Sequence, residues 1–338
     1  MKYISCQEPG SFRFAERSAP TPKAGEALLK MTRVGICGTD LHAYQGNQPF
    51  FSYPRILGHE LAAEIIEVGP NDQTLKAGDQ VAIMPYLNCG HCIACRHGKT
   101  NCCSTLKVLG VHIDGGMQEI ISLPTDILIP ANHLSPEQIA IIEPLSIGAH
   151  AVRRAQIQKG ETVVVMGCGP IGIGIMQLAK LEGAQVIALD INPQRLAYAE
   201  KTLGLQHLIN VQNDPIEQIK AITQGDMATK VFDATGNQAS LLSGPDYLAH
   251  GGSYILVGLL KGDLTYYHPA IHAKETSILC SRNATMEDFA RVIEVLSKNQ
   301  FPVDQYITHR VGFGQMIEHF ESWIDPKSQV MKAMVSFG

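Results

Sequence analysis

The spacing of apolar residues changes near residue 160 of the chain. Before that point, short segments with alternating apolar and polar residues are separated by glycines and prolines. They include ALLKMTRVG (27–35), LAAEIIEVG (61–69) and LKAGDQVAIMPY (75–86). Alternation with a period of two, bounded by turn residues, is typical of strands with one buried face. The first part of the chain is therefore predicted to be β-rich and irregular.

After residue 160, continuous apolar runs alternate with segments that have helical spacing. The runs begin with ETVVVMG (161–167) and end near ETSILCS (275–281). Strands buried on both faces, with helices between them, predict a doubly wound parallel sheet of about six strands. The last helix and strand-like pieces are too short to form a core alone, so we expect them to return to the first domain. The predicted domain boundaries are 1–146, 147–284 and 285–338.

Composition and charge limit the class of protein. The 338 residues are 45% hydrophobic and 17% charged, as in an ordinary globular protein. A net charge of -5 argues against a nucleic-acid or membrane-surface partner. The N-terminus lacks the apolar core of a signal peptide, and no apolar stretch has the length of a membrane helix. The nine cysteines are then better explained as metal ligands and buried thiols than as disulfides. The expected location is the cytoplasm.

A dinucleotide fingerprint begins the second region. Gly167, Gly169 and Gly172 form G-x-G-x-x-G between an apolar strand and a helix, and Asp190 follows 18 residues after the last of them. The glycines let the backbone approach a pyrophosphate, and the carboxylate accepts hydrogen bonds from ribose hydroxyls while repelling a 2′-phosphate. NAD is therefore predicted in preference to NADP. The predicted cofactor-binding residues are Gly167, Gly169, Pro170, Ile171, Gly172, Asp190 and Arg195.

Four cysteines are concentrated between residues 88 and 104. Cys89, Cys92 and Cys95 have the spacing C-x₂-C-x₂-C, and Cys103 follows after seven residues. Closely spaced thiolates suit a tetrahedral zinc site, and four of them leave no position for a substrate, so this metal would be structural. An iron–sulfur cluster also uses four cysteines, although the neighbouring motifs favour zinc.

The stretch GICGTDLHAYQGNQPFFSYPRILGHE (35–60) contains a second possible metal site. Cys37, His59 and Glu60 offer a thiolate, an imidazole and a carboxylate, all of which bind Zn²⁺. The alternative is a set of unconnected polar loop residues. Glu143 precedes a proline at the start of a predicted helix, where an acidic residue usually complements the helix dipole. It could instead be a metal ligand.

Several motifs together resemble the zinc-dependent alcohol and polyol dehydrogenases of the medium-chain dehydrogenase/reductase superfamily. They are GICGTDLH, GHE, the four-cysteine lobe, EPLSIGAH and VMGCGPIG, in the family's order and over essentially the full length. The segments GNQPFFSYPR, RHGKTNCC, GVHIDGG, SRNATMEDFA and ITHR are most similar to the bacterial sugar-acid branch. That branch contains L-galactonate/L-gulonate 5-dehydrogenases and starvation-sensing-protein-like oxidoreductases.

The resemblance implies a GroES-like catalytic domain, divided by a Rossmann NAD-binding domain, with the active site between them. By position, Cys37 and His59 would bind a catalytic zinc, and Glu60 and Glu143 would bind it directly or through a water. Asp40 would hold His59 in one tautomer. A carboxylate in place of a second thiolate suggests exchange with Mn²⁺ or Co²⁺. The resemblance further implies two zinc ions per subunit, one of them in the cysteine lobe, and assembly as a homodimer or homotetramer.

The expected reaction is the oxidation of a secondary alcohol. Zinc would lower the pKa of the substrate hydroxyl, and the hydride would pass to NAD⁺. Thr39 would accept the proton and His42 would pass it to solvent. Taken alone, Thr39 could be a turn hydroxyl and His42 an exposed loop residue.

A sugar acid needs a partner for its carboxylate, and the planar fork of arginine suits this role. Arg282 is the first candidate and Arg310 a weaker one. The predicted substrate residues are Arg282, Asn283, Asn47, Gln48 and His112. The alternatives within enzymes are a sorbitol-like polyol dehydrogenase and an L-threonine dehydrogenase. The alternative outside enzymes is a non-catalytic NAD- and metal-binding regulatory protein.

Overall fold

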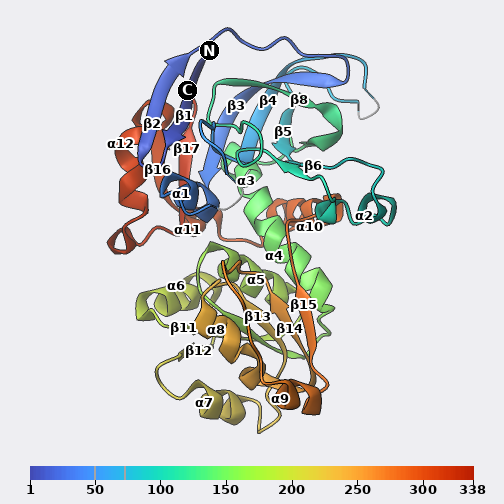
Figure 1. The fold of residues 1–338 in the computed structure, drawn as a ribbon, viewed down its shortest axis with the longest axis vertical. Coiled ribbons are helices and arrows are strands. Elements are labelled where there is room, and N and C mark those ends of the chain that lie inside the picture. Colours follow the sequence, from blue (N-terminus) through green and yellow to red (C-terminus); the bar gives the residue numbers. More distant parts are fainter. Residues whose placement is uncertain (49–50, 72–73) are drawn as a thin grey trace. The chain divides into compact units, whose positions relative to one another are not determined.

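The computed structural model describes residues 1–48, 51–71 and 74–338. The contacts within the chain divide it into two compact units. The first unit consists of Met1–Pro144 together with Thr285–Gly338, and the second of Leu145–Ala284. The N-terminal and C-terminal segments, blue and red in Figure 1, therefore belong to one folding unit, and the second unit is inserted between them.

The first unit is organised around β3 (Glu26–Ile36), the longest strand of a seven-stranded sheet. It pairs antiparallel with β4 (Glu60–Val68) on one side and with β17 (Lys332–Ser336) on the other. β8 (Ile120–Pro124) pairs with the beginning of β3. The other strands of this sheet are β5 (Gln80–Ile83), β9 (Leu128–Pro130) and β16 (Ile307–Gly312).

The predicted alternation is present in β3. Leu29 and Met31 are fully buried, whereas Lys30 between them is exposed. At the end of the strand the alternation stops, and Val34, Gly35 and Ile36 are all buried. The two faces of β3 are thus both covered where it approaches the residues of the predicted metal site.

Shorter elements surround this sheet. β1 (Lys2–Glu8) and β2 (Ser11–Glu16) form an antiparallel hairpin, and β6 (Tyr86–Leu87) pairs with β7 (Lys107–Val108). The helices of the first unit are α1 (Gly38–Tyr44), α2 (Ile93–Arg96), α3 (Pro136–Ala140), α10 (Met286–Ser297), α11 (Val303–Tyr306) and α12 (Met316–Phe320). α4 (Ile142–Ala155) begins in the first unit and continues in the second. Short 3₁₀ segments of the first unit are Thr100–Cys102, Thr125–Ile127, Phe313–Gln315, Glu321–Trp323 and Pro326–Ser328, and Gly244–Tyr247 is one in the second unit.

The second unit contains a six-stranded sheet with helices between its strands, as the apolar runs predict. All its pairings are parallel, in the order β12-β11-β10-β13-β14-β15. The strand order reverses beside β10, which has β11 on one side and β13 on the other. In doubly wound sheets such a reversal creates the ligand-binding crevice at the carboxyl ends of the strands. The strands are β10 (Thr162–Met166), β11 (Gln185–Asp190), β12 (His207–Asn210), β13 (Ala228–Asp233), β14 (Leu248–Leu256) and β15 (Ser277–Cys280).

The helices of the second unit begin where the sequence supplies suitable residues. Prolines occupy the first turns of α5, α6 and α7, where a missing backbone N–H costs nothing. Asn192 caps α6 by accepting from the Gln194 N–H, and Gly204 ends it with φ +63°. The helices are α5 (Pro170–Leu181), α6 (Pro193–Leu203), α7 (Pro215–Ile222), α8 (Gln238–Ser243) and α9 (His268–Ala273).

No helix in the described ranges combines the length and the apolar character that a membrane crossing requires.

Candidate active site and metal centres

The antiparallel pairing of β3 with β4 brings the two halves of the first predicted metal site together. Gly35 near the end of β3 lies opposite Glu60, the first residue of β4. Cys37 follows the end of one strand and His59 precedes the start of the other, so the two lie at the same end of the pair. Gly35 is required here because a Cβ at this position would lie 2.1 Å from Glu60 Oε2.

Cys37, His59 and Glu60 form a compact set of possible metal ligands. One donor atom from each residue lies within 4.8 Å of the others. His59 and Glu60 are buried, and His59 Nδ1 is a buried atom without a hydrogen-bond partner. A buried polar atom without a partner is costly, and a thiolate–imidazole–carboxylate set suits Zn²⁺. The residues at this position therefore fit a zinc ion.

Asp40 links the two segments that carry these residues. Its Oδ2 accepts the Cys37 N–H at 2.9 Å, and its Oδ1 accepts the Gly58 N–H at 3.2 Å. The sequence led us to expect a hydrogen bond from His59 to Asp40, but His59 Nδ1 lies 3.9 Å from Asp40 Oδ1, which is too far for a hydrogen bond. Asp40 therefore fixes the backbone on both sides of the cluster and acts on His59 only through its charge.

Glu60 is paired with a lysine that the sequence analysis did not identify. Lys332 Nζ lies 2.5 Å from Glu60 Oε1 and 2.7 Å from Oε2, and donates to the Ile36 carbonyl at 3.1 Å. β17 places it there by pairing with the end of β3. A single lysine within the apolar run VMKAMV was the available signal, because a charge at an inward strand position needs a buried partner.

Glu143 lies outside the group formed by Cys37, His59 and Glu60. It is buried in the first turn of α4, and its Oε1 accepts a short hydrogen bond from the Tyr86 hydroxyl. Burial, together with the charge of Glu60 and against the effect of His59, raises the pKa of Glu143 to about 7. Glu143 is therefore close enough to the cluster to interact with its charges. Nothing in the sequence around Tyr86 indicated this contact.

The charges around His59 and Lys332 favour their protonated forms. Burial lowers the pKa of His59, but Asp40 and Cys37 together raise it well above its usual value. Burial alone would lower the pKa of Lys332, but the charge of Glu60 outweighs burial and raises the pKa of Lys332 above its usual value. A region that stabilises positive charge to this extent is also favourable for a divalent cation.

Thr39 and His42 lie three residues apart on α1, directly after Cys37. Residues at this spacing lie on the same face of a helix. Thr39 is half-buried and His42 is exposed. The pair thus extends from a half-buried position two residues after Cys37 toward solvent.

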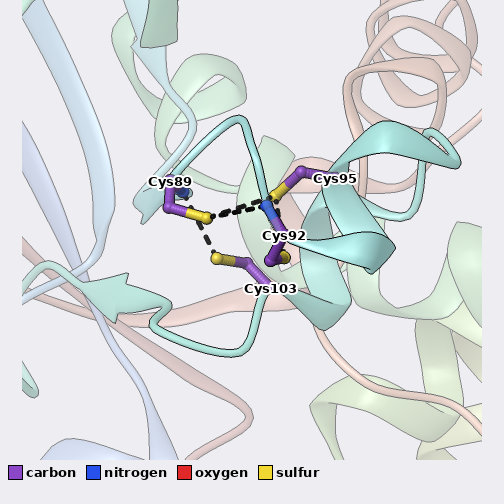
Figure 2. A group of neighbouring side chains, drawn as sticks. All are labelled: Cys89, Cys92, Cys95 and Cys103. Atoms are coloured by element: carbon purple, nitrogen blue, oxygen red, sulfur yellow. Dashed lines mark hydrogen bonds between the residues drawn. The ribbon is translucent and has the colours of Figure 1, made fainter.

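The four cysteines of the lobe converge. Figure 2 shows their sulfurs directed toward one another, and all four lie within 4.8 Å. The Sγ atoms of Cys92 and Cys95 are 3.5 Å apart, and those of Cys89 and Cys95 are 4.0 Å apart. Sulfurs at zinc–thiolate distance from one ion would be about 3.8 Å apart, whereas a disulfide needs about 2.05 Å. The spacing fits a single zinc ion and leaves little space for a multi-iron cluster.

The loop backbone stabilises negative charge on two of these thiols. Hydrogen bonds from backbone N–H groups lower the pKa of Cys89 to about 7 and of Cys92 to about 5. Burial and the neighbouring thiols raise the pKa of Cys95 to about 12. Cys102 is exposed and does not belong to the group.

The glycine-rich turn connects β10 to α5 at the reversal of the strand order. Gly167 has φ +98°, a conformation that favours glycine. A Cβ on Gly172 would lie 1.8 Å from the Gly167 carbonyl oxygen, whereas one on Gly169 would meet nothing within 4 Å. Gly172 is thus needed for the turn itself, while Gly169, the N-cap of α5, leaves open space at the helix N-terminus. Pro170 and Ile171 form the first turn of α5.

Asp190 ends β11, next to the turn. Its Oδ2 accepts the Cys168 N–H at 2.7 Å and its Oδ1 accepts the Asn192 N–H at 2.8 Å. These bonds fix the carboxylate relative to the glycine loop. Arg195 lies in the first turn of α6 and is half-buried. The predicted cofactor residues therefore lie at the carboxyl ends of the neighbouring strands β10 and β11 and in the helices that follow them.

The predicted substrate residues are spread over both units. Asn47 is exposed and Gln48 half-buried just after α1, and residues 49–50 of the GNQPFFSYPR segment lie outside the described residues. His112 accepts the Val108 N–H through its Nδ1, so this nitrogen supports a local turn. Arg282 is exposed in the second unit, and Asn283 has φ +53°. Arg310 binds Glu137 through two hydrogen bonds of 2.8 and 2.9 Å.

Comparison with known proteins gives matches over the whole chain. The profile described as "Alcohol dehydrogenase GroES-like domain" matches residues 23–133, and that described as "Zinc-binding dehydrogenase" matches residues 170–298. L-galactonate-5-dehydrogenase of Escherichia coli (strain K12) is 44% identical over 337 residues, covering 100% of this chain and 99% of the relative.

Two solved structures are also similar. The rspB alcohol dehydrogenase of Escherichia coli CFT073, crystallised with NADH, has a TM-score of 0.93 and 32% identity, with 100% of this chain and 99% of that one covered. L-idonate 5-dehydrogenase of Escherichia coli K-12 substr. MG1655 has a TM-score of 0.90 and 26% identity, with 99% and 98% covered.

The chain belongs to the zinc-type medium-chain alcohol dehydrogenases, which are oxidoreductases that act on small molecules. The predicted fold, a GroES-like domain with a Rossmann-type domain, is confirmed.

Proposed function

We propose that this protein is a zinc-dependent NAD(H) oxidoreductase that oxidises a secondary alcohol of a sugar acid, of the L-galactonate/L-gulonate type, to the ketone. The observation that carries the dehydrogenase chemistry is the convergence of Cys37, His59 and Glu60 in one cluster, in which His59 and Glu60 are buried. The sugar-acid substrate is supported by the similarity to L-galactonate-5-dehydrogenase over the full length.

Cys37 and His59 would hold the catalytic zinc, with Glu60 and Glu143 acting on it directly or through a water. When bound, zinc lowers the pKa of an alcohol and so favours loss of its proton. Cys89, Cys92, Cys95 and Cys103 would hold a second, structural zinc. Because one ligand of the first site is a hard carboxylate rather than a second thiolate, we expect that site to accept Mn²⁺ or Co²⁺ more readily than the cysteine lobe.

Oxidation of a secondary alcohol releases one proton and one hydride. Thr39 would accept the proton from the substrate hydroxyl, and His42 would pass it to solvent. Their order along α1, half-buried and then exposed, supports this direction. The hydride acceptor is NAD⁺, whose nicotinamide supplies that chemistry.

The glycine turn after β10 would hold the pyrophosphate of NAD at the N-terminus of α5. Asp190 would accept hydrogen bonds from the adenosine ribose, and its charge would repel the 2′-phosphate of NADP. Pro170 and Ile171 would contribute from the first turn of α5, and Arg195 from that of α6. The substrate carboxylate would bind Arg282, and Asn283, Asn47, Gln48 and His112 are the other candidates for contacts with the substrate.

We further propose that the protein assembles as a homodimer or homotetramer through β15. This strand is an edge of the parallel sheet, paired only with β14 among the described residues. Its Ile278 side chain is 37% exposed. Unpaired strand edges with exposed apolar residues favour pairing with another chain. Light scattering gives the mass in solution, so measurements on the wild type and on Ile278→Lys would test this proposal. A wild type with the mass of one chain would contradict it.

The experiment that tests the function is NADH production followed by absorbance with L-galactonate, L-gulonate, sorbitol and L-threonine. The assay is run on the intact protein, after chelator treatment, and after zinc is returned. We expect turnover of an aldonate that is lost with the metal and restored by Zn²⁺. Activity on sorbitol or L-threonine alone would contradict the sugar-acid substrate but keep the chemistry. If the protein turned over none of the four substrates but still bound NADH, a regulatory protein would be favoured.

A further inference from the structure

The contact between Tyr86 and Glu143 is the least expected feature of the metal-site region. Tyr86 is 3% exposed and Glu143 is 5% exposed, and the phenol hydroxyl donates to Glu143 Oε1. Both residues belong to the first unit. A phenol–carboxylate hydrogen bond inside protein is strong, because one partner carries charge and no water competes with it.

Both partners are fixed from outside the cluster. Tyr86 lies on β6, where it pairs with Val108 of β7, and its ring packs edge-on against Phe289 with centroids 6.5 Å apart. The neighbouring Pro85 carbonyl accepts the Leu109 N–H at 3.0 Å. Glu143 is held by the first turn of α4. The phenol hydroxyl therefore has a defined position, and the carboxylate meets it there.

This position is separate from the group of possible ligands. Among the described residues, Cys37, His59 and Glu60 form that group, and Glu143 is not a member. Glu143 nevertheless interacts with the charges of His59 and Glu60, so it belongs to the same charged region as the group. Without the Tyr86 hydroxyl, the buried Glu143 carboxylate would lack this donor, an unfavourable state that favours a move toward a metal ion.

We propose that Tyr86 is a positioning residue that holds Glu143 out of the inner coordination sphere of the catalytic metal. One coordination position then stays open for the substrate oxygen, as catalytic zinc sites require. This inference rests on the proposed zinc site at Cys37, His59 and Glu60, and it assigns Glu143 to an indirect rather than a direct contact with the ion.

The test measures metal binding in the full-length protein without substrate. Tyr86→Phe removes the hydroxyl and keeps the ring. We expect the variant to bind Zn²⁺ at the exchangeable site about tenfold more tightly in competition with a chelator, because Glu143 becomes an additional anionic ligand. We also expect weaker visible absorption of Co²⁺ at this site, because an added ligand raises the coordination number. Adding Glu143→Gln to Tyr86→Phe should remove both effects.

The matched control is Tyr254→Phe. It removes another buried hydroxyl, which donates to the Leu241 carbonyl at 2.9 Å in the second unit, and should leave metal binding unchanged. Weaker Zn²⁺ binding by Tyr86→Phe would overturn the inference, because the hydroxyl would then support Glu143 as a direct ligand. Equal Zn²⁺ binding would also overturn it, because the hydroxyl would then make a purely structural contact.

Glu143→Gln in the wild-type background gives a second test that does not depend on the folding of Tyr86→Phe. If Glu143 is outside the inner sphere, the intensity of the Co²⁺ absorption stays the same; a change in intensity overturns the inference. If the wild type binds metal only in the cysteine lobe, both the inference and the proposed function are wrong. If the wild type binds metal as expected but turns over no aldonate, the substrate assignment alone is wrong.

Discussion

Lys332 Nζ contacts both carboxylate oxygens of Glu60, at 2.5 and 2.7 Å, and the two residues are 2% and 0% exposed. The pair joins β17, near the end of the chain, to β4, and its Glu60 belongs to the candidate catalytic cluster. Because the two charges cancel, Glu60 adds no net charge to the cluster while Lys332 is present.

Removal of Lys332 should destabilise the first unit. Lys332→Met leaves Glu60 as an unpaired buried charge, and we expect a loss of about 3–5 kcal/mol in the free energy of unfolding of the metal-free protein. Lys332→Met with Glu60→Gln should recover part of this loss, because no unpaired charge remains. Chemical denaturation of the single and double variants measures both values.

An exposed pair with the same shortest distance gives the control. Lys298 and Glu294 are also 2.5 Å apart, with side chains 57% and 46% exposed. Lys298→Met should therefore change the unfolding midpoint little, because water screens exposed pairs. If Lys298→Met and Lys332→Met lowered the free energy of unfolding equally, burial would not make the Lys332–Glu60 pair more important for stability than an exposed pair.

The four-cysteine lobe offers two cysteines for comparison. Cys92 belongs to the converging group, whereas Cys102 is exposed and outside it. Cys92→Ser should reduce the zinc content by about one ion per chain and make the loop at 88–104 sensitive to proteolysis. Cys102→Ser should do neither. Mass spectrometry measures the zinc content of both variants. A full zinc content in Cys92→Ser would show that the lobe is not a zinc site.

Two glycines of the nucleotide turn should respond differently to alanine. A Cβ at Gly172 would lie 1.8 Å from the Gly167 carbonyl oxygen, so Gly172→Ala should cost about 1–3 kcal/mol or more of stability. Gly169 has open space and an ordinary φ of −78°. Gly169→Ala should fold with a loss of about 1 kcal/mol at most, yet bind NADH about tenfold more weakly, because its methyl group occupies the pyrophosphate position.

Fluorescence titration with NADH and denaturation curves separate these two effects. An unchanged affinity for NADH in Gly169→Ala would contradict a pyrophosphate at this turn. A stable Gly172→Ala would show that the turn can rearrange around the added carbon.

The sequence was sufficient for the parts of this protein that depend on local pattern. The period of the apolar residues predicted the parallel sheet, and the spacing of Gly167, Gly169 and Gly172 predicted the turn after β10. The convergence of Cys89, Cys92, Cys95 and Cys103 also followed from short spacing, because a loop of this length keeps its ligands near one another.

Contacts between distant segments could not be predicted in the same way. Lys332 and Glu60 are joined by the register of β17 and β4 on β3, which no local pattern specifies. Tyr86 reaches Glu143 because β6 pairs with β7 beside the lobe, again a matter of tertiary packing. The hydrogen bonds of Asp40 show a further limit: its importance was expected, but its partners are backbone groups on both sides of the cluster.

Two arginines give a final test, of the proposed substrate. Arg310 already binds the Glu137 carboxylate with its planar fork, at 2.8 and 2.9 Å, and this bond lowers the pKa of Glu137, so the pair persists at neutral pH. Arg282→Gln should raise the KM for L-galactonate by roughly 10- to 100-fold, the equivalent of a hydrogen bond to a charged group. It should change the KM for sorbitol little, because sorbitol has no carboxylate.

Arg310→Gln should leave both KM values unchanged and lower the stability by about 1 kcal/mol at most, since its ion pair is partly exposed. Steady-state kinetics of both variants with both substrates distinguishes the roles. If Arg282→Gln impairs sorbitol and L-galactonate equally, Arg282 supports the fold or the cofactor rather than the carboxylate. If Arg310→Gln alone raises the KM for L-galactonate, the substrate must displace Glu137, and the carboxylate site then lies in the first unit.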